Sequence, residues 1–253
     1  MTIERNIRMK GVLLAGGDCT RIQEQLTVPT KCLIPIGGRT LLEYNLIALQ
    51  KLCVEEIIII VGKNGDALAR AVGQSYAGIP LRCIRQPVPL GIVHALTFAC
   101  EAIGEADFAL RLGDELFIEE KTIEVLDFWN SSGADCVCGV TQGEPLEALR
   151  NNYSLLVEGD AVLDLVEKPE HPFNDYKGTG FCLFRNCMLQ YLDQTPVNAK
   201  TGQYDLCDWI RLAIRDKRSI KLFLAAKKEI NVNTAEDLRR ARMLLECTEG
   251  ECS

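Results

Sequence analysis

The 253-residue sequence predicts an α/β protein with three layers, in which a mostly parallel mixed sheet is covered by helices on both faces. Two observations predict this fold. Short apolar runs alternate with amphipathic stretches through the first half of the chain, an order typical of parallel strands joined by helices. Hydrophobic residues make up 47% of the chain and charged residues 25%, so a chain of this length can bury a sizeable core.

The first half alternates strands with helices. The β-branched run at residues 57–61 and the apolar run at 9–15 are the clearest strand signals. Strands are predicted at residues 9–15, 56–61, 81–85 and 108–112, and helices at residues 40–52, 64–76 and 91–103.

The second half, from about residue 134, is richer in short strands. Gly159 predicts a tight turn between two of them, and Thr234 with Asp237 resembles a helix-starting capping box. Strands are predicted at residues 136–141, 154–157, 161–166, 180–184, 220–225 and 229–232, and helices at 204–216 and 234–246. We therefore expect one domain, residues 1–247, followed by a frayed polar tail at 248–253.

Charge and hydropathy exclude several classes of protein. A net charge of −7 argues against a broad nucleic-acid-binding surface, and the apolar runs are too short to cross a membrane. Residues 1–10 do not resemble a signal peptide, so a cytoplasmic location is expected. The 12 cysteines form no C-x-x-C pair and only two histidines accompany them. We expect reduced thiols that act as small core residues, with Cys136 and Cys138 facing the same way.

A glycine loop follows the first predicted strand. Parallel sheets bind ligands beyond the carboxyl ends of their strands, and Gly16 and Gly17 allow backbone N–H groups to approach phosphate oxygens. Arg21 adds a bidentate phosphate donor. Neither the dinucleotide nor the P-loop glycine pattern fits here, and two glycines alone favour an ordinary strand-to-helix turn over a phosphate site.

Lys31 lies ten residues beyond Arg21. The chain resembles the signature of the sugar-phosphate nucleotidyltransferases, which include glucose-1-phosphate thymidylyltransferase and uridylyl-, cytidylyl- and guanylyltransferases. The segments that carry this resemblance are Leu14-Ala15-Gly16-Gly17, Thr20-Arg21, Lys31-x-Leu33-x-Pro35 and Leu41-Leu42-Glu43-Tyr44. It implies a Rossmann-like nucleotidyltransferase fold with a small β-rich lid that binds the acceptor. Residues 1–133 would then form the nucleotide-binding half and 134–247 the acceptor-binding half.

Further matches extend the resemblance to about residue 245. The segment from Gln86 to Gly91 resembles the family's base-recognition segment, and a glutamine amide can pair with a pyrimidine edge. Gly113-Asp114 resembles the metal site at the end of a strand. Glu167-Lys168 resembles the pair in which Glu contacts sugar hydroxyls and Lys contacts the sugar phosphate, and Thr179-Gly180 resembles the loop that closes over the acceptor.

The resemblance implies Mg²⁺-dependent transfer of a nucleoside monophosphate from a nucleoside triphosphate to a phosphorylated small molecule, such as a sugar 1-phosphate. Asp114 would hold Mg²⁺ together with Asn231 or Asn233. The implied catalytic residues are Arg21, Lys31, Asp114 and Lys168; the nucleotide-binding residues are Leu14, Ala15, Gly16, Gly17, Thr20, Gln86 and Gly91; and the acceptor-binding residues are Glu167, Lys168, Thr179 and Gly180.

Three departures from the family pattern leave alternatives open. Cys19 replaces a common glycine, Thr30 separates Pro29 from Lys31, and asparagine replaces the usual second aspartate. A pyrimidine nucleotide is favoured, but cytidylyl or guanylyl transfer to a non-sugar phosphate or phosphonate is a second hypothesis. A catalytically inactive sensor of nucleotide sugars is a third. A homo-oligomer is compatible with the sequence, whereas a nucleic-acid or membrane partner is not expected.

Overall fold

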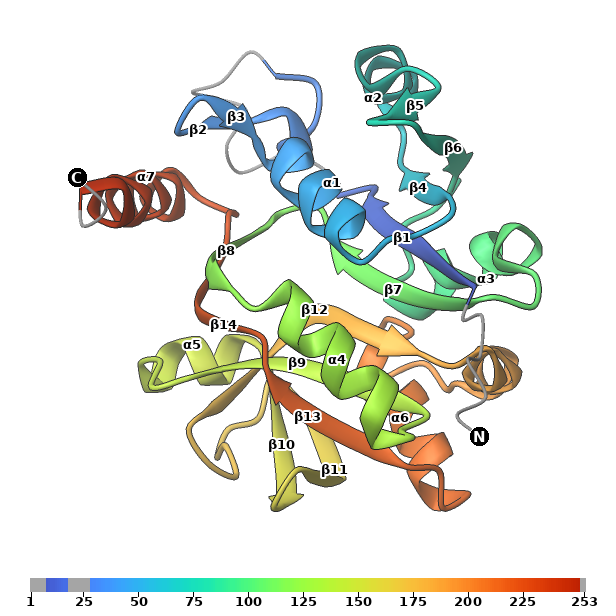
Figure 1. Ribbon diagram of the computed structural model, residues 1–253. Helices are drawn as coiled ribbons and strands as arrows, with labels where there is room; N and C mark the ends of the chain where they lie inside the picture. Colours follow the sequence, from blue (N-terminus) through green and yellow to red (C-terminus); the bar gives the residue numbers. More distant parts are fainter. Residues whose placement is uncertain (1–7, 18–27, 251–253) are drawn as a thin grey trace.

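The computed structural model describes residues 8–17 and 28–250, without the side chains of 248–250. A mixed sheet runs through the molecule in the order β10-β11-β13-β9-β12-β7-β1-β4-β6-β5, and helices pack on both of its faces (Figure 1). The predicted α/β fold with three layers is confirmed.

The first half of the chain builds the parallel part of the sheet. Strands β1 (Met9–Ala15), β4 (Ile57–Val61), β6 (Ile79–Arg85) and β7 (Asp107–Leu112) run parallel, so their carboxyl ends meet at one edge. Helices α1 (Leu41–Lys51), α2 (Gly65–Val72) and α3 (Ile92–Ile103) connect them. Each of these strands was predicted, because apolar residues fill it almost continuously or, in β6, partly buried residues alternate with exposed ones over most of its length.

The second half adds antiparallel strands. Strand β12 (Tyr176–Phe184) is antiparallel to both β7 and β9 (Cys136–Gln142), and β13 (Ile220–Leu224) is parallel to β9. Strands β10 (Tyr153–Glu158) and β11 (Ala161–Glu167) form the predicted hairpin, with Gly159 at φ 60° in its turn. Because β12 is antiparallel to β7, its first residues lie at the edge where β7 ends.

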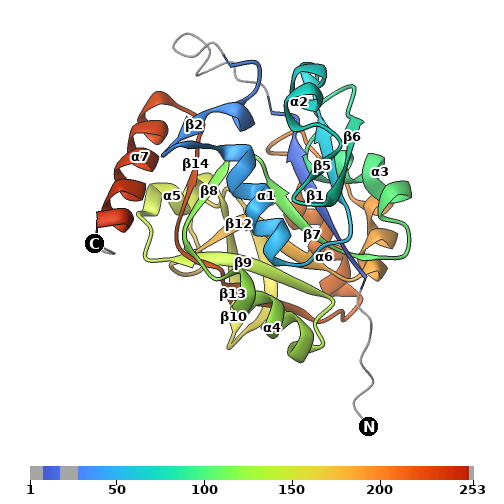
Figure 2. The ribbon, with the colours of Figure 1, turned by 45° about the horizontal axis from the view of Figure 1, so that its top comes forward.

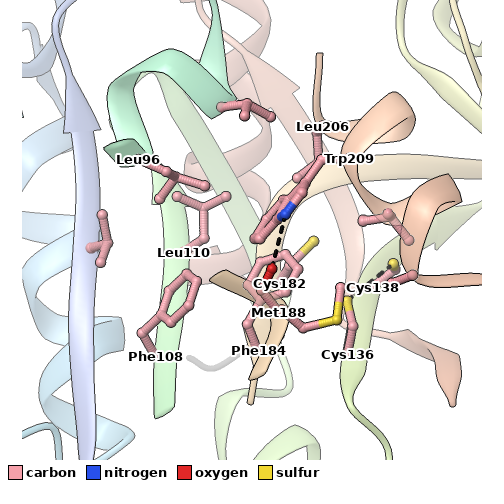
Figure 3. Close-up of a cluster of buried hydrophobic side chains, with 14 of the residues drawn as sticks. Leu96, Phe108, Leu110, Cys136, Cys138, Cys182, Phe184, Met188, Leu206 and Trp209 are labelled. Carbon is pink, nitrogen blue, oxygen red and sulfur yellow. Dashed lines mark hydrogen bonds between the residues drawn. The ribbon is translucent and has the colours of Figure 1, made fainter. Parts of the chain in front are cut away.

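The core lies on both faces of the sheet. On one face, α3, α6 (Leu206–Arg215) and the 3₁₀ segment Asn186–Gln194 bury Phe108, Phe184 and Trp209 (Figure 3). The Trp209 indole donates to the carbonyl of Met188 at 3.1 Å. On the other face, α1 and α4 (Thr122–Ser132) contribute a second cluster that includes Trp129.

The prediction that the cysteines act as core residues holds for half of those that the structure describes. Of these ten, five are buried, three are partly buried, and Cys53 and Cys247 are exposed. Cys136 and Cys138 share one face of β9, with 3.8 Å between their sulfur atoms. They pack as small apolar side chains in the cluster of Figure 3.

Several element boundaries differ from the prediction. Helix α2 ends at Val72 rather than residue 76, because Gly73 takes a positive φ of 71°, and β5 (Ser75–Tyr76) then pairs with β6. Helix α7 (Ala235–Gly250) continues four residues past its predicted end, into the segment expected to be a frayed tail. The elements that the sequence analysis missed are α4, α5 (Leu146–Asn151), β8 (Glu115–Glu120), the 3₁₀ segments Lys31–Leu33 and Asn186–Gln194, and the short strands β2 (Pro35–Ile36) and β3 (Arg39–Thr40).

A third, smaller cluster attaches α7 to the rest of the molecule. Strand β8 pairs with β14 (Ala226–Asn231), and α7 packs against both strands and β2 (Figure 2). This pairing brings the chain after β7 next to the chain after β14. In the described part of the chain, no helix is both long and apolar enough to cross a membrane.

Helix α1 begins with a complete capping box, so removing the Thr40 cap should measurably destabilise the protein. The Thr40 hydroxyl accepts from the Glu43 N–H at 3.2 Å, and Glu43 accepts from the Thr40 N–H at 2.6 Å. We expect Thr40→Ala to lower the free energy of unfolding by about 1 kcal/mol, measured by urea denaturation. Ser131→Ala, whose hydroxyl bonds lie within α4, is the control; equal midpoints for the two variants would contradict the prediction.

Candidate active site

A cavity of about 290 Å³ lies beyond the carboxyl ends of the parallel strands. Its walls come from the last residues of β1, β4 and β7 and from the chain segments that follow β1, β6 and β7, as expected for ligand sites in parallel sheets. The residues that line it are Leu14, Gly16, Gly17, Lys31, Cys32, Ile60, Gln86, Pro89, Gly91, Ile92, Ala95, Leu112, Asp114 and Gln203. Five of the seven predicted nucleotide-binding residues are therefore found together with Lys31 and Asp114.

The other two predicted nucleotide-binding residues are placed differently. Ala15 is buried and lines a recess of about 10 Å³ beside the main cavity. Thr20 lies outside the described residues, as do the predicted catalytic Arg21 and the departure at Cys19.

A polar cluster occupies the rim of the cavity. The Lys31 ammonium lies 3.3 Å from Asp114 Oδ2 and also donates to Asn233 Oδ1. Asn233 in turn donates to Asn231 Oδ1 at 2.6 Å. The β8–β14 pairing explains this convergence, because the Val232 N–H donates to the Asp114 carbonyl at 2.8 Å.

This cluster has the chemistry of a site for a hard cation. Its three acceptors are one carboxylate and two amide oxygens, the ligand types that Mg²⁺ takes in proteins. The oxygens of Asp114 and Asn233 already converge on one positive charge, the Lys31 ammonium. No group of three or more Cys, His, Asp or Glu side chains with metal-binding geometry occurs among residues 8–17 and 28–250. The asparagines therefore decide whether the site can hold a metal.

The segment from Gln86 to Gly91, predicted to recognise the base, is fixed by several contacts beside the cavity. The buried Gln86 donates its own backbone N–H to the Val61 carbonyl at 2.9 Å. Its side-chain nitrogen contacts His94 Nδ1 at 2.8 Å and the Gly91 carbonyl at 3.5 Å. A Cβ on Gly91 would lie 2.7 Å from the Tyr204 carbonyl oxygen, and Gly91 has φ 108°, so only glycine fits.

The predicted acceptor pair lies outside the lining of this cavity. Glu167 and Lys168 end β11, and their charged groups are 3.8 Å apart. Burial raises the pKa of Glu167, and the neighbouring Asp205 raises it further. Lys168 has a positive φ of 45°, a strained conformation for a non-glycine residue, and half of its side chain is exposed.

One loop connects the two halves of the site. In residues 198–204, Gln203 lines the cavity and the Tyr204 N–H donates to the Leu90 carbonyl at 2.9 Å. Lys200 of the same loop donates to the carbonyl of Lys168. The predicted acceptor pair and the segment predicted to recognise the base therefore contact the same short loop.

Gly180 contacts Glu115, the residue after Asp114, and the Thr179 side chain is buried in the protein interior. The Thr179 hydroxyl donates to the Gly139 carbonyl at 2.8 Å. The Gly180 N–H donates to both carboxylate oxygens of Glu115, at 2.9 Å each. A Cβ on Gly180 would lie 2.2 Å from Leu112 Cγ, so the strands could not approach this closely with a larger residue.

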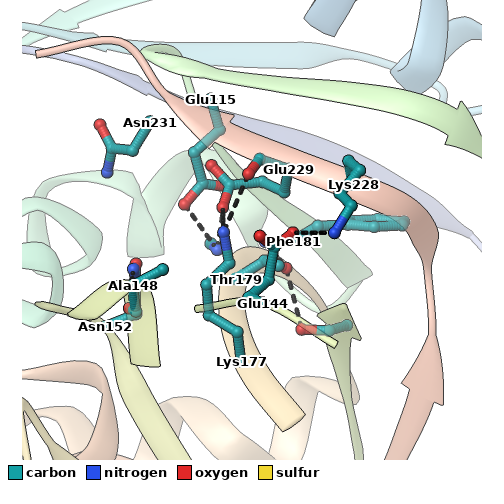
Figure 4. Close-up of polar contacts among 12 residues, drawn as sticks. Glu115, Glu144, Ala148, Asn152, Lys177, Thr179, Phe181, Lys228, Glu229 and Asn231 are labelled. Atoms are coloured by element: carbon teal, nitrogen blue, oxygen red, sulfur yellow. Dashed lines mark hydrogen bonds and ion pairs between the residues drawn. The ribbon is translucent and has the colours of Figure 1, made fainter. Parts of the chain in front are cut away.

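A buried ionic cluster supports this part of the site (Figure 4). The Lys177 ammonium lies 2.6 Å from Glu229 Oε2 and donates to the Glu229 carbonyl at 2.9 Å. Burial raises the pKa of Glu229, although Lys177 acts in the opposite direction. Burial also raises the pKa of Glu115 well above its usual value, and the neighbouring Glu229 and Asp114 raise it further.

Four further residues at the site were not predicted from the sequence: Gln203, Lys200, Lys177 and Glu229. Gln203 and Lys200 stand in a polar loop with no motif of their own. Lys177 and Glu229 are 52 residues apart, so no local pattern connects them. Glu115 directly follows the Gly113-Asp114 motif, but its contact with Gly180 depends on the antiparallel placement of β12.

Comparisons with known proteins agree with the geometry. A family model described as nucleotidyl transferase matches residues 10–245. A glucose-1-phosphate thymidylyltransferase from Streptomyces griseus is 29% identical over 96% of this chain and 68% of that protein. A UTP–glucose-1-phosphate uridylyltransferase from Haloferax volcanii is 25% identical over 94% of this chain and 97% of that protein.

Solved structures share the fold. A UDP-glucose pyrophosphorylase complexed with UDP-glucose superposes with a TM-score of 0.84 at 19% identity, covering 96% of this chain and 100% of that one. An apo UDP-glucose pyrophosphorylase gives a TM-score of 0.82 at 18% identity, with the same two coverages. At such identities the likeness establishes the fold alone.

Proposed function

Because the chain belongs to the nucleotidyl transferase family, we propose that it transfers a nucleoside monophosphate from a nucleoside triphosphate to a sugar 1-phosphate, with release of pyrophosphate. The observation that carries the proposal is the cavity at the carboxyl edge of the sheet. It combines the Gly16–Gly17 backbone, the cation Lys31 and the anion Asp114 with an amide at Gln86. The activities that name the Streptomyces and Haloferax relatives support a sugar 1-phosphate as acceptor and a pyrimidine nucleotide as donor.

The chain's own residues would act mainly by positioning and charge neutralisation, which dominate phosphoryl-type transfer. An acceptor phosphate oxygen attacks the α-phosphorus in line, a new P–O bond forms, and the bond to pyrophosphate breaks. The backbone N–H groups at Gly16 and Gly17, with Arg21, would bind the departing phosphates. Lys31 would offset the charge at the α-phosphate. Lys168 would hold the acceptor phosphate, and Glu167 the sugar hydroxyls.

A divalent cation is part of the proposal. Asp114, Asn231 and Asn233 would hold Mg²⁺, because the oxygens of Asp114 and Asn233 already converge on the Lys31 ammonium and Asn231 is hydrogen-bonded to Asn233. When bound, Mg²⁺ supplies charge neutralisation between the two reacting phosphates. Lys31 would then pair with phosphate oxygens instead of with Asp114.

The direct test is pyrophosphate release from each of five nucleoside triphosphates, with Mg²⁺, against a panel of sugar 1-phosphates and phosphocholine. Release that depends on one triphosphate and one sugar 1-phosphate is the expected result. Release with phosphocholine alone would instead favour a non-sugar acceptor. Nucleotide binding without release for any pair would contradict the proposal and favour an inactive sensor.

Metal removal gives a second prediction. We expect excess EDTA to abolish pyrophosphate release and added Mg²⁺ to restore it, because two asparagines and one carboxylate hold the metal less tightly than two carboxylates would. For the same reason, replacing the asparagine that binds the metal, Asn231 or Asn233, with aspartate should lower the Mg²⁺ concentration that gives the half-maximal rate. Full activity in EDTA would contradict the metal assignment.

A further inference from the structure

The side chain of Gln86 has a defined orientation, and His94 fixes it. A glutamine amide can present either its oxygen, an acceptor, or its NH₂ group, a donor, to a bound base. In this structure the amide nitrogen contacts two groups, His94 Nδ1 at 2.8 Å and the Gly91 carbonyl at 3.5 Å. The carbonyl can only accept, so the end of the amide that faces it must be the NH₂ group.

This orientation determines the tautomer of His94. Because the Gln86 NH₂ group donates to Nδ1, that nitrogen carries the lone pair and the proton resides on Nε2. The ring is held in place by Phe98, whose centroid is 5.1 Å away in an edge-to-face arrangement, and by Tyr204 at 6.3 Å. Tyr204 is itself tied to this segment, because its backbone N–H donates to the Leu90 carbonyl and its carbonyl accepts from the Val93 N–H.

The amide oxygen is left to the ligand. Both hydrogens of the NH₂ group are engaged, and no donor to Gln86 Oε1 exists among residues 8–17 and 28–250. The oxygen lies on the side of Gly16, 3.6 Å from the position of a Cβ there, and both residues line the cavity. Gln86 therefore presents an acceptor to the base.

We propose that His94 is a positioning residue that locks the Gln86 amide and thereby selects a pyrimidine with a ring N–H, uracil or thymine, over cytosine. Uracil and thymine carry a hydrogen on N3 that can donate to Oε1. Cytosine has a lone pair at N3, which would face the oxygen and leave both acceptors unsatisfied in a desolvated site. The inference deepens the proposed transferase function and rests on it.

The test compares UTP, dTTP and CTP in the wild-type protein and in three variants. His94→Leu removes the acceptor and frees the amide to rotate, so its NH₂ group can pair with N3 of cytosine. We expect the ratio of kcat/KM for UTP over CTP to fall about tenfold or more, chiefly because the value for CTP rises. A gain with CTP is a change that simple loss of structure does not produce.

Two matched variants distinguish a positioning role of His94 from a general structural effect of its substitution. His94→Asn places an amide oxygen where Nδ1 stood and should retain most of the discrimination. Thr97→Ala alters an exposed hydroxyl that bonds the His94 carbonyl, and it should leave the ratio unchanged. Loss of discrimination in His94→Asn equal to that in His94→Leu would overturn the role of the Nδ1 acceptor.

The outcomes for the two proposals can be told apart. A wild-type protein that uses CTP as well as UTP, or a His94→Leu ratio equal to the wild-type ratio, overturns the role of His94 and leaves the transferase proposal standing. Absence of pyrophosphate release with every triphosphate contradicts the transferase proposal. Calorimetric binding of UTP and CTP to the same variants then decides the role of His94 on its own.

Discussion

Asp114→Ala should lower kcat for pyrophosphate release by about 1,000-fold or more while the protein stays folded. Asp114 supplies the only carboxylate of the described cluster that also contains Lys31, Asn231 and Asn233. With that charge removed, two neutral amides remain to hold a divalent cation beside a cationic ammonium. The Asp114 side chain is 24% exposed at the cavity rim, so its truncation opens no large void in the core.

The controls for this prediction separate charge from shape. Asp114→Asn keeps the size of the side chain but removes its charge, and its kcat should fall nearly as far as that of the alanine variant. Asp127→Ala removes an exposed carboxylate on α4 and should leave kcat unchanged. Thermal unfolding of all three variants checks the fold. An Asp114→Ala enzyme with kcat within about threefold of wild type would show that Asp114 is not a metal ligand.

Sequence patterns predicted the parallel half of the fold because its signals are local. Residues 57–61 are continuously apolar and β-branched, and residues 41–51 repeat buried positions at helical spacing after a threonine cap. The same reasoning failed at 64–76, since the amphipathic pattern continues past Gly73, where a positive φ ends the helix. Helix α4 had a weak signal, with Thr122, Val125 and Trp129 buried on one face, that its polar flanks obscured.

The residues of the candidate site could be predicted where the order of strands along the chain places them. They could not be predicted where antiparallel pairing of distant strands places them. Gly16, Gln86 and Asp114 each come just after a parallel strand, so topology alone brings them to one edge, where Lys31 joins them. The antiparallel strand β12 has no such signature. Its predicted start was Gly180, because the charged Lys177 interrupts the apolar pattern. That charge is tolerated in the interior only because Glu229 meets it from β14, on a separate two-stranded sheet.

Lys177→Met should therefore lower the free energy of unfolding by about 3–5 kcal/mol, the largest stability effect that we predict. The side chains of Lys177 and Glu229 are 4% and 0% exposed, and their charged atoms lie 2.6 Å apart. Methionine fills the space of the lysine stem, but it leaves the Glu229 carboxylate buried without its cation. For a chain of this size the loss corresponds to a decrease in Tm of roughly 6–20 °C.

A surface pair provides the matched control. Lys221 lies 2.9 Å from Asp160, and the two side chains are partly exposed to solvent. Lys221→Met makes the same chemical change where water can solvate the remaining carboxylate, so it should cost at most about 1 kcal/mol. Equal losses for Lys177→Met and Lys221→Met would mean that the buried pair contributes no more than an ordinary surface ion pair.

The double variant Lys177→Met/Glu229→Leu identifies the physical cause. If the loss in Lys177→Met comes from an unpaired buried charge, replacing that charge with an apolar side chain should recover most of the stability, since buried ion pairs contribute little net stability over apolar packing. If the loss comes instead from the bond between Lys177 and the Glu229 carbonyl, which anchors β14 two residues before Asn231, the double variant should remain as unstable as the single one. Urea midpoints of the single and double variants distinguish the two causes, and kcat of the double variant reports whether that anchor also positions Asn231.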